Sequence, residues 1–283
     1  MKTEGQNLKS AIRLSAIWPQ SAISSFGLLF AFALLCVTLS LISPYFLTLR
    51  NLTNVLAQGS INTVLAIGLT FVIIGGGIDL SVGSALALVG VVMAALVERT
   101  LSAPVAIAVG LLSGLTIGAL NGLVVVRTRI PPFIVTLGTL SVARGLAFIF
   151  AGGRTIPVQP VALRVWGEGR LLGVPVPTII AFALVVIAHV VLTRSVFGRH
   201  LFAIGGNERA AWIAGVQTGL TKWVSYLISG FAVFIGALIS VGRLGSADPI
   251  RGEGYELDAI AAVIIGVVII AAVLLDQMRH KNP

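Results

Sequence analysis

The sequence predicts an all-α polytopic membrane protein, and its composition, apolar blocks and glycine content support that fold class. Of the 283 residues, 57% are hydrophobic and 10% are charged, with a mean hydropathy of +1.04. Soluble domains carry about 25% charged residues. The 32 glycines suit helices that pack closely in lipid. These features exclude a soluble globular protein.

Eight apolar blocks are long enough to serve as transmembrane helices, which need about 20 residues, or fewer in buried spans. We expect the first block to be retained, because it is too long for a signal-peptide core and follows a basic leader with Lys2, Lys9 and Arg13. The blocks cover residues 26–43, 61–77, the stretch from just after 79 to 97, 105–126, 133–151, 178–192, 223–241 and 259–275. The sequence therefore predicts about eight spans.

The distribution of Lys and Arg predicts the orientation. These residues are more numerous in the loops that lie inside when the N-terminus is cytoplasmic, as the positive-inside rule requires. An even number of spans then places the C-terminus in the cytoplasm as well. The net charge of +9 is spread among apolar blocks and does not form the basic stripe of a nucleic-acid-binding protein. We therefore expect contact with membrane lipid and none with nucleic acid.

A tight junction separates the second and third blocks, where Gly75-Gly76-Gly77 precedes Asp79 and Ser81. An acid near membrane depth is costly and normally faces protein or water. Consecutive glycines permit backbone shapes that lipid would not tolerate if exposed. Asp79 therefore either caps and packs the next helix, as Ser81 could also do, or contacts substrate directly. The sequence leaves both interpretations open.

Four glycines recur at every fourth position of the fourth block and so line one helical face. They are Gly110, Gly114, Gly118 and Gly122. This stripe predicts a helix that packs closely against the face. Asn121 neighbours the stripe, so a helix beside a substrate path is the alternative to plain packing.

The long inside loop, residues 193–222, contains a pattern that predicts a short helix. Asn207 can cap its N-terminus, Glu208 lies in its first turn, and Gly215 can end it. Its small face consists of Ala210, Ala211 and Ala214. Two large apolar residues beside that face, Trp212 and Ile213, are unusual for a loop in water. We expect a docking helix, with a solvated connector as the alternative.

Residues for enzyme chemistry are scarce in this chain. No lysine falls in a Gly-x4-Gly-Lys-Ser/Thr motif, so the sequence lacks a P-loop for nucleotide phosphates. His189, His200 and His280 lie apart and no His-Glu-x-x-His occurs, so no metal site is expected. The single cysteine, Cys36, excludes an internal disulfide. The sequence predicts neither catalytic residues nor a cofactor bound by this chain.

Three separated motifs resemble the permease subunit of bacterial ATP-binding-cassette (ABC) importers of ribose and related monosaccharides. They are residues 77–84, 197–216 and 254–263. The resemblance implies two permease subunits in the inner membrane, identical or different, that receive sugar from a periplasmic binding protein. ATP would be bound and hydrolysed by a separate ATPase subunit. The chain is therefore expected to pass a monosaccharide, a pentose such as ribose, inward by alternating access.

The resemblance also implies a domain organisation and site residues. Residues 26–275 would form the permease domain, between a cytoplasmic segment at 1–25 and a cytoplasmic tail at 276–283. The inside loop would couple the permease to the ATPase through Gly198, Arg199, Gly205, Asn207, Glu208, Ala211 and Gly215. Because sugars are neutral, polar residues are the candidates for the substrate path, namely Asp79, Ser84, Asn121 and Thr136.

The sequence departs from the family pattern near its end. Residues 262–266 run directly into 267–276, where the family has a Gly-Gly-Thr-Ser-rich stretch and further helices in between. We infer an internal deletion, which keeps the tail cytoplasmic if two spans are lost. A truncated permease that cannot transport is therefore one alternative. A secondary transporter or channel that needs no ATPase is another.

Overall fold

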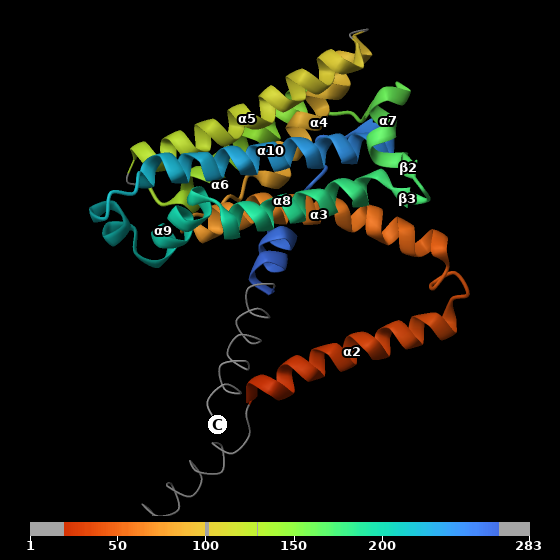
Figure 1. Cartoon of the computed structure of the whole chain (residues 1–283). Helices are drawn as coiled ribbons and strands as arrows, with labels where there is room; N and C mark the ends of the chain where they lie inside the picture. The colour runs from red at the N-terminus through yellow and green to blue at the C-terminus, as the bar shows by residue number, and fades with distance from the viewer. Residues whose placement is uncertain (1–19, 100–101, 129, 266–283) are drawn as a thin grey trace, which may run out of the picture. The chain divides into compact units, whose positions relative to one another are not determined.

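The computed structural model describes residues 20–99, 102–128 and 130–265 (Figure 1). The chain divides into two compact units, Met1–Asn54 and Val55–Pro283. The helices are α2 (Gln20–Ile42), α3 (Leu49–Ile74), α4 (Val82–Glu98), α5 (Ala103–Arg127), α6 (Pro132–Ala151), α7 (Val161–Glu168), α8 (Val176–Arg194), α9 (Val196–Ile213) and α10 (Thr218–Leu244). Residues 255–265 are also helical.

Four two-residue strands lie between and after the helices. Strand β1 (Ile156–Pro157) pairs antiparallel with β4 (Ser246–Ala247), and β2 (Arg170–Leu171) pairs antiparallel with β3 (Val174–Pro175). The first pair joins the chain after α6 to the chain after α10. These strands and the short helix α7 were not predicted from the sequence, because such brief elements leave no hydrophobic period to detect.

Five helices of the described chain are long and apolar enough to cross a membrane: α3, α5, α6, α8 and α10. Helix α4 and residues 30–42 of α2 are apolar but shorter. The predicted all-α polytopic membrane class is confirmed. The count of eight spans and the side on which each terminus lies remain predictions, and the last block extends beyond the residues described.

The helices that match the apolar blocks begin and end within six residues of them, except at the start of α3. This helix begins at Leu49, well before residue 61 where the second block was predicted to start. Its early turns contain Arg50, Asn51, Asn54 and Gln58, which lower the hydropathy without interrupting the helix. Hydropathy therefore located the buried part of α3 and missed its polar beginning.

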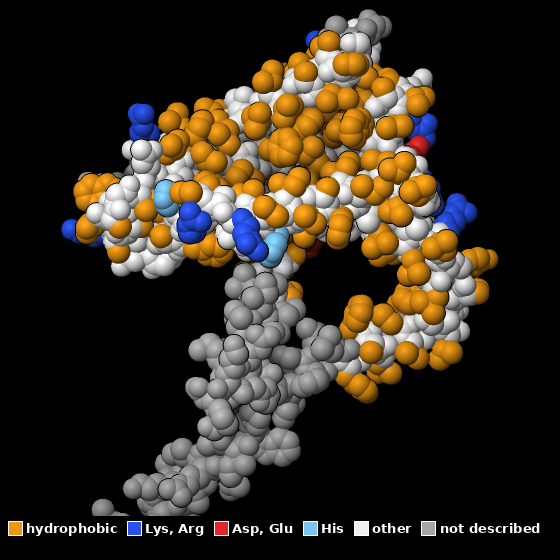
Figure 2. Space-filling view, in the orientation of Figure 1, with side chains coloured by type: hydrophobic (Ala, Val, Ile, Leu, Met, Phe, Trp, Pro, Cys, Tyr) orange, Lys and Arg blue, Asp and Glu red, His pale blue; other side chains and the backbone are white. Residues whose placement is uncertain are grey.

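Helix α10 lies at the centre of the second unit and packs against α4, α5 and α7. Within its most apolar 18-residue stretch, 72% of residues are buried, compared with 11% for α8. The exposed flank of the molecule is correspondingly apolar, and Figure 2 shows hydrophobic side chains covering it between charged groups near the two ends. This pattern fits a core around α10 and a lipid-facing outer surface.

The glycine stripe of α5 is the surface on which α10 packs. A Cβ added to Gly114 would lie 2.6 Å from the carbonyl oxygen of Gly230, and one added to Gly118 would overlap the carbonyl oxygen of Tyr226. Both obstacles are backbone atoms, which a side-chain rotation cannot move. The structure therefore accounts for Gly114 and Gly118 as a backbone-to-backbone contact between α5 and α10, whereas a Cβ on Gly110 would meet the Met93 side chain of α4.

Gly118→Ala is expected to destabilise the protein by about 1–3 kcal/mol, the usual cost of overpacking, because its methyl group meets the α10 backbone. Gly145→Ala is the matched control in α6, where nothing lies within 4 Å of an added Cβ. There the higher helix propensity of alanine should preserve or raise stability. Unfolding of each purified variant in detergent measures both effects, and equal stabilities would contradict the backbone contact.

Candidate functional site

A buried polar cluster forms where the chain passes from α3 to α4. Gly76 adopts a φ of +78°, a left-handed conformation that favours glycine. A Cβ added to Gly77 would lie 2.7 Å from the Tyr226 hydroxyl oxygen of α10. The three-glycine junction therefore allows a sharp turn pressed against α10, which delivers Asp79 into the protein interior.

Asp79 is 2% exposed and accepts hydrogen bonds on both carboxylate oxygens. Its Oδ1 accepts from the Ser81 backbone N–H at 3.0 Å and from the Ser81 hydroxyl at 2.6 Å. Its Oδ2 accepts from the Ser229 hydroxyl of α10 at 2.9 Å. These bonds replace the water that a buried carboxylate loses, and they tie the start of α4 to the middle of α10.

The cluster continues into α5 and α6 through Asn121. The Asn121 side-chain amide donates to the Ser81 hydroxyl at 2.9 Å, and its carbonyl oxygen accepts from the Thr139 hydroxyl. Asn121 is 1% exposed, so its position beside the glycine stripe is an interior one. A continuous chain of hydrogen bonds thus links α10, the α4 N-terminus, α5 and α6.

Thr136 holds the same junction from α6. Its hydroxyl oxygen accepts from the Leu80 backbone N–H at 3.1 Å and lies 3.2 Å from the Ile78 carbonyl oxygen, to which it can donate. Thr136 is fully buried. It therefore secures the backbone on both sides of Asp79.

Three of the four predicted path residues, Asp79, Asn121 and Thr136, are thus brought together and hydrogen-bonded within the protein. This geometry supports the packing interpretation of Asp79 over direct substrate contact. Ser84 lies one turn along α4, is 1% exposed, and has no hydrogen-bond partner for its hydroxyl. Sequence reasoning missed Thr139 and Ser229, since nothing near them distinguishes these hydroxyls from others in apolar helices.

The inside loop contains the predicted cap at Asn207. Helix α9 breaks at this residue, whose φ of −159° and ψ of 101° are extended, and the Asn207 Oδ1 accepts from the Ala210 backbone N–H at 3.0 Å. The second helical part ends before Gly215, which has a φ of +88°. The short capped helix is confirmed, and the helical part from Val196 to the break was not predicted.

The predicted coupling residues divide between anchors and exposed groups. A Cβ on Gly198 would overlap the Leu192 carbonyl oxygen of α8, and one on Gly205 would overlap the Ile74 carbonyl oxygen at the end of α3. These glycines therefore let α9 lie directly against two membrane helices. Arg199 is exposed.

Beyond the break, Glu208 forms an ion pair with Lys222 of α10 at 2.6 Å. Ala211 is buried, whereas Trp212 and Ile213 are 66% and 72% exposed. The short helix is therefore attached to α10 and presents two large apolar side chains outward. Among the residues described, no three His, Cys, Asp or Glu side chains gather to hold a metal.

Comparison with known proteins identifies the family. Residues 51–275 match the model of the branched-chain amino acid transport system / permease component family. The chain belongs to this permease family. It is therefore a transport component of the inner membrane and crosses that membrane several times.

Several named permeases are similar to this chain. The ribose import permease protein RbsC of Escherichia coli (strain K12) is 40% identical over 242 residues, which cover 84% of this chain and 75% of that protein. RbsC of Bacillus subtilis (strain 168) is 40% identical over 235 residues, covering 82% and 73%. The L-arabinose transport system permease protein AraH of E. coli (strain K12) is 34% identical over 258 residues, covering 91% and 77%. No solved structure shows a significant match.

Ser229→Ala is expected to destabilise the permease by about 1–3 kcal/mol, because the buried Asp79 Oδ2 loses its hydrogen-bond donor. Ser113→Ala is the control, since the Ser113 hydroxyl of α5 bonds only to a carbonyl oxygen of its own helix at 2.8 Å. It should change stability by less than about 0.5 kcal/mol. Denaturant unfolding in detergent measures the difference, and a neutral Ser229→Ala would argue against the cluster.

Proposed function

We propose that the chain is the permease subunit of an ATP-driven monosaccharide importer and that it carries a pentose, ribose first among candidates, into the cell. The observation that carries this proposal is the 40% identity to ribose import permeases across most of the chain. Relatives at 34–35% identity are named for arabinose and allose transport. The relatives named for sugar transport therefore favour a monosaccharide as the transported substrate over the amino acid in the family's description.

The proposal assigns the energy source to other subunits. A separate ATPase subunit docks on the short helix after Asn207, a periplasmic binding protein delivers the sugar, and a second permease subunit completes the assembly. The exposed Trp212 and Ile213 support the docking site, because large apolar side chains beside a capped, anchored helix suit a protein partner. The inside loop is then the coupling segment, residues 193–222.

The proposed mechanism passes force from this segment to α10. A push on the short helix acts through the Glu208–Lys222 ion pair on the first turns of α10. Helix α10 in turn is bonded to Asp79 through Ser229, so the junction of α3 and α4 moves with it. Closure of the ATPase subunits would thereby rock the bundle and change the side to which the path opens.

Reconstitution tests the function. Liposomes that contain the permease with its ATPase subunit and binding protein are expected to accumulate labelled ribose only when ATP is present, with weaker uptake of arabinose and allose and none of leucine. Uptake in vesicles without an ATPase subunit would instead support a secondary transporter or channel. An assembled complex that hydrolyses ATP without sugar uptake would support a transport-incompetent permease.

Glu208→Lys combined with Trp212→Glu is expected to lower ATPase co-purification at least fivefold while the permease stays folded, because both side chains are exposed and a surface ion pair contributes only about 0–1 kcal/mol to stability. Glu168→Lys is the control and breaks an ion pair with Arg164 on α7 whose acidic side chain is similarly exposed, 44% compared with 51% for Glu208. Pull-down from detergent and ribose uptake report the effect. Wild-type levels of both in the double variant would remove the docking assignment.

A further inference from the structure

The segment after β4 turns back toward the middle of the bundle. A Cβ added to Gly252 would lie 2.5 Å from the Gly83 carbonyl oxygen, and one added to Gly83 would overlap the Gly252 carbonyl oxygen. Gly252 has a φ of +74°, which favours glycine. The backbone at Gly252 therefore lies directly on the first turn of α4.

This contact is at membrane depth. Helix α10 has 27 residues, so it extends about 40 Å and exceeds the hydrocarbon core of about 30 Å. Ser229, which bonds to Asp79, lies about 16 Å from its start, and Gly236, which meets Leu86, lies about 12 Å from its end. Gly83 is between these two levels. Residues 248–258, which we call the re-entrant segment, thus reach the central part of the membrane.

Arg144 of α6 fixes the re-entrant segment there. One guanidinium nitrogen donates to the Pro249 and Arg251 carbonyl oxygens. Glu253 and Glu256 are close enough to interact with the same guanidinium electrostatically. An irregular backbone and several charges at this depth are tolerated only against protein or in a water-filled cavity.

The buried polar side-chain atoms that lack a hydrogen-bond partner also concentrate here. Within the described residues they are the Ser84 hydroxyl, the Arg251 Nε and the Glu256 Oε2. Ser84 is 1% exposed and follows Gly83, against which the Glu256 carboxylate lies. Buried polar atoms are nearly always paired, so three unpaired ones on the first turn of α4 and the segment packed against it call for a binding role. Together they offer a donor, an acceptor and a hydroxyl, the set that complements the hydroxyl groups of a sugar.

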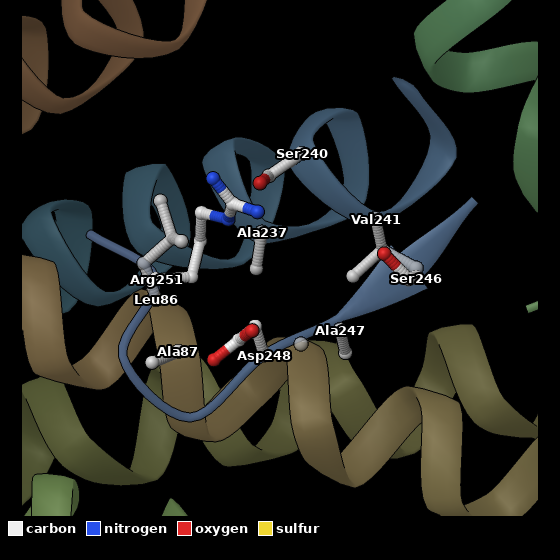
Figure 3. A pocket seen from close by; sticks show the side chains of 10 residues that line it. Leu86, Ala87, Ala237, Ser240, Val241, Ser246, Ala247, Asp248 and Arg251 are labelled. Carbon is white, nitrogen blue, oxygen red and sulfur yellow. The ribbon is translucent and has the colours of Figure 1, made fainter. Parts of the chain in front are cut away.

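The neighbouring pocket is closed to a sugar in this conformation. Figure 3 shows the Arg251 side chain extending toward Ser240 of α10, with Asp248 across the pocket. Its volume is about 10 Å³, which suffices for a single water molecule. Passage of a sugar therefore requires α10 and the re-entrant segment to separate.

We infer that the re-entrant segment lines the substrate path at mid-membrane, with the Arg251 Nε–H and the Glu256 Oε2 hydrogen-bonding the hydroxyl groups of a neutral sugar and Arg144 positioning the segment. This inference rests on the proposed sugar transport. It moves the substrate contacts from Asp79, Asn121 and Thr136 to charged groups after β4, and it retains Ser84.

Transport stoichiometry tests the sugar contact. In liposomes that contain the full transporter and ribose-loaded binding protein, Glu256→Ala is expected to lower ribose transported per ATP hydrolysed at least fivefold, with ATPase activity within twofold of wild type. Glu256→Gln keeps an acceptor oxygen and should restore at least half of the ratio. Glu168→Ala, an exposed acid on α7, is the control and should match wild type. A wild-type ratio in Glu256→Ala overturns the inference.

Cysteine accessibility tests the path without relying on sugar identity. In a Cys36→Ser background, Leu257→Cys is compared with Ile187→Cys near the middle of α8; the native side chains are 65% and 56% exposed. A charged methanethiosulfonate reagent should label Leu257→Cys at least tenfold faster in the full transporter, because only a water-lined position reacts. Equal rates overturn the inference. If the wild-type transporter takes up no sugar, the proposed function fails, and labelling still decides whether this segment faces water.

Discussion

A carboxylate can remain at the centre of a membrane bundle only if hydrogen bonds replace the water it has lost, and Asp79 imposes this constraint on the second unit. Its oxygens take hydrogen bonds from the α4 start and from Ser229 of α10. Asn121 then extends the cluster toward α6. Helices that are distant in sequence are thus aligned by one buried charge, and a shift of any of them would leave a polar group unpaired.

Close packing of the helices is the second interaction that holds the bundle together. Lipid gives little hydrophobic reward for burying one apolar helix against another, so association depends on short backbone approach and on interior polar bonds. The α5 stripe provides the first through Gly114 and Gly118, and the Asp79 cluster provides the second. The same two devices recur after β4, where Gly83 meets Gly252 and Arg144 holds the returning backbone.

The sequence was sufficient for features that depend on local chemistry. Apolar runs located the main helices, and the cap at Asn207 was predictable because the Asn207 side chain and the Ala210 backbone N–H that donates to it lie three positions apart. Features that depend on partners distant in sequence were not predicted. Thr139 and Ser229 are ordinary hydroxyls until folding brings them to Asn121 and Asp79. The early turns of α3 were not predicted for a different reason. Their polar residues lower the hydropathy, although the backbone there is helical.

The seam between α5 and α10 has a mechanical consequence. Where Gly118 meets Tyr226 and Gly114 meets Gly230, backbone lies on backbone without side chains that could change rotamer to make room. Sliding one helix along the other would force main-chain atoms to overlap, so the two helices behave as a single rigid body. Motions that leave this rigid body intact must take place at softer contacts, such as those of the sparsely buried α8.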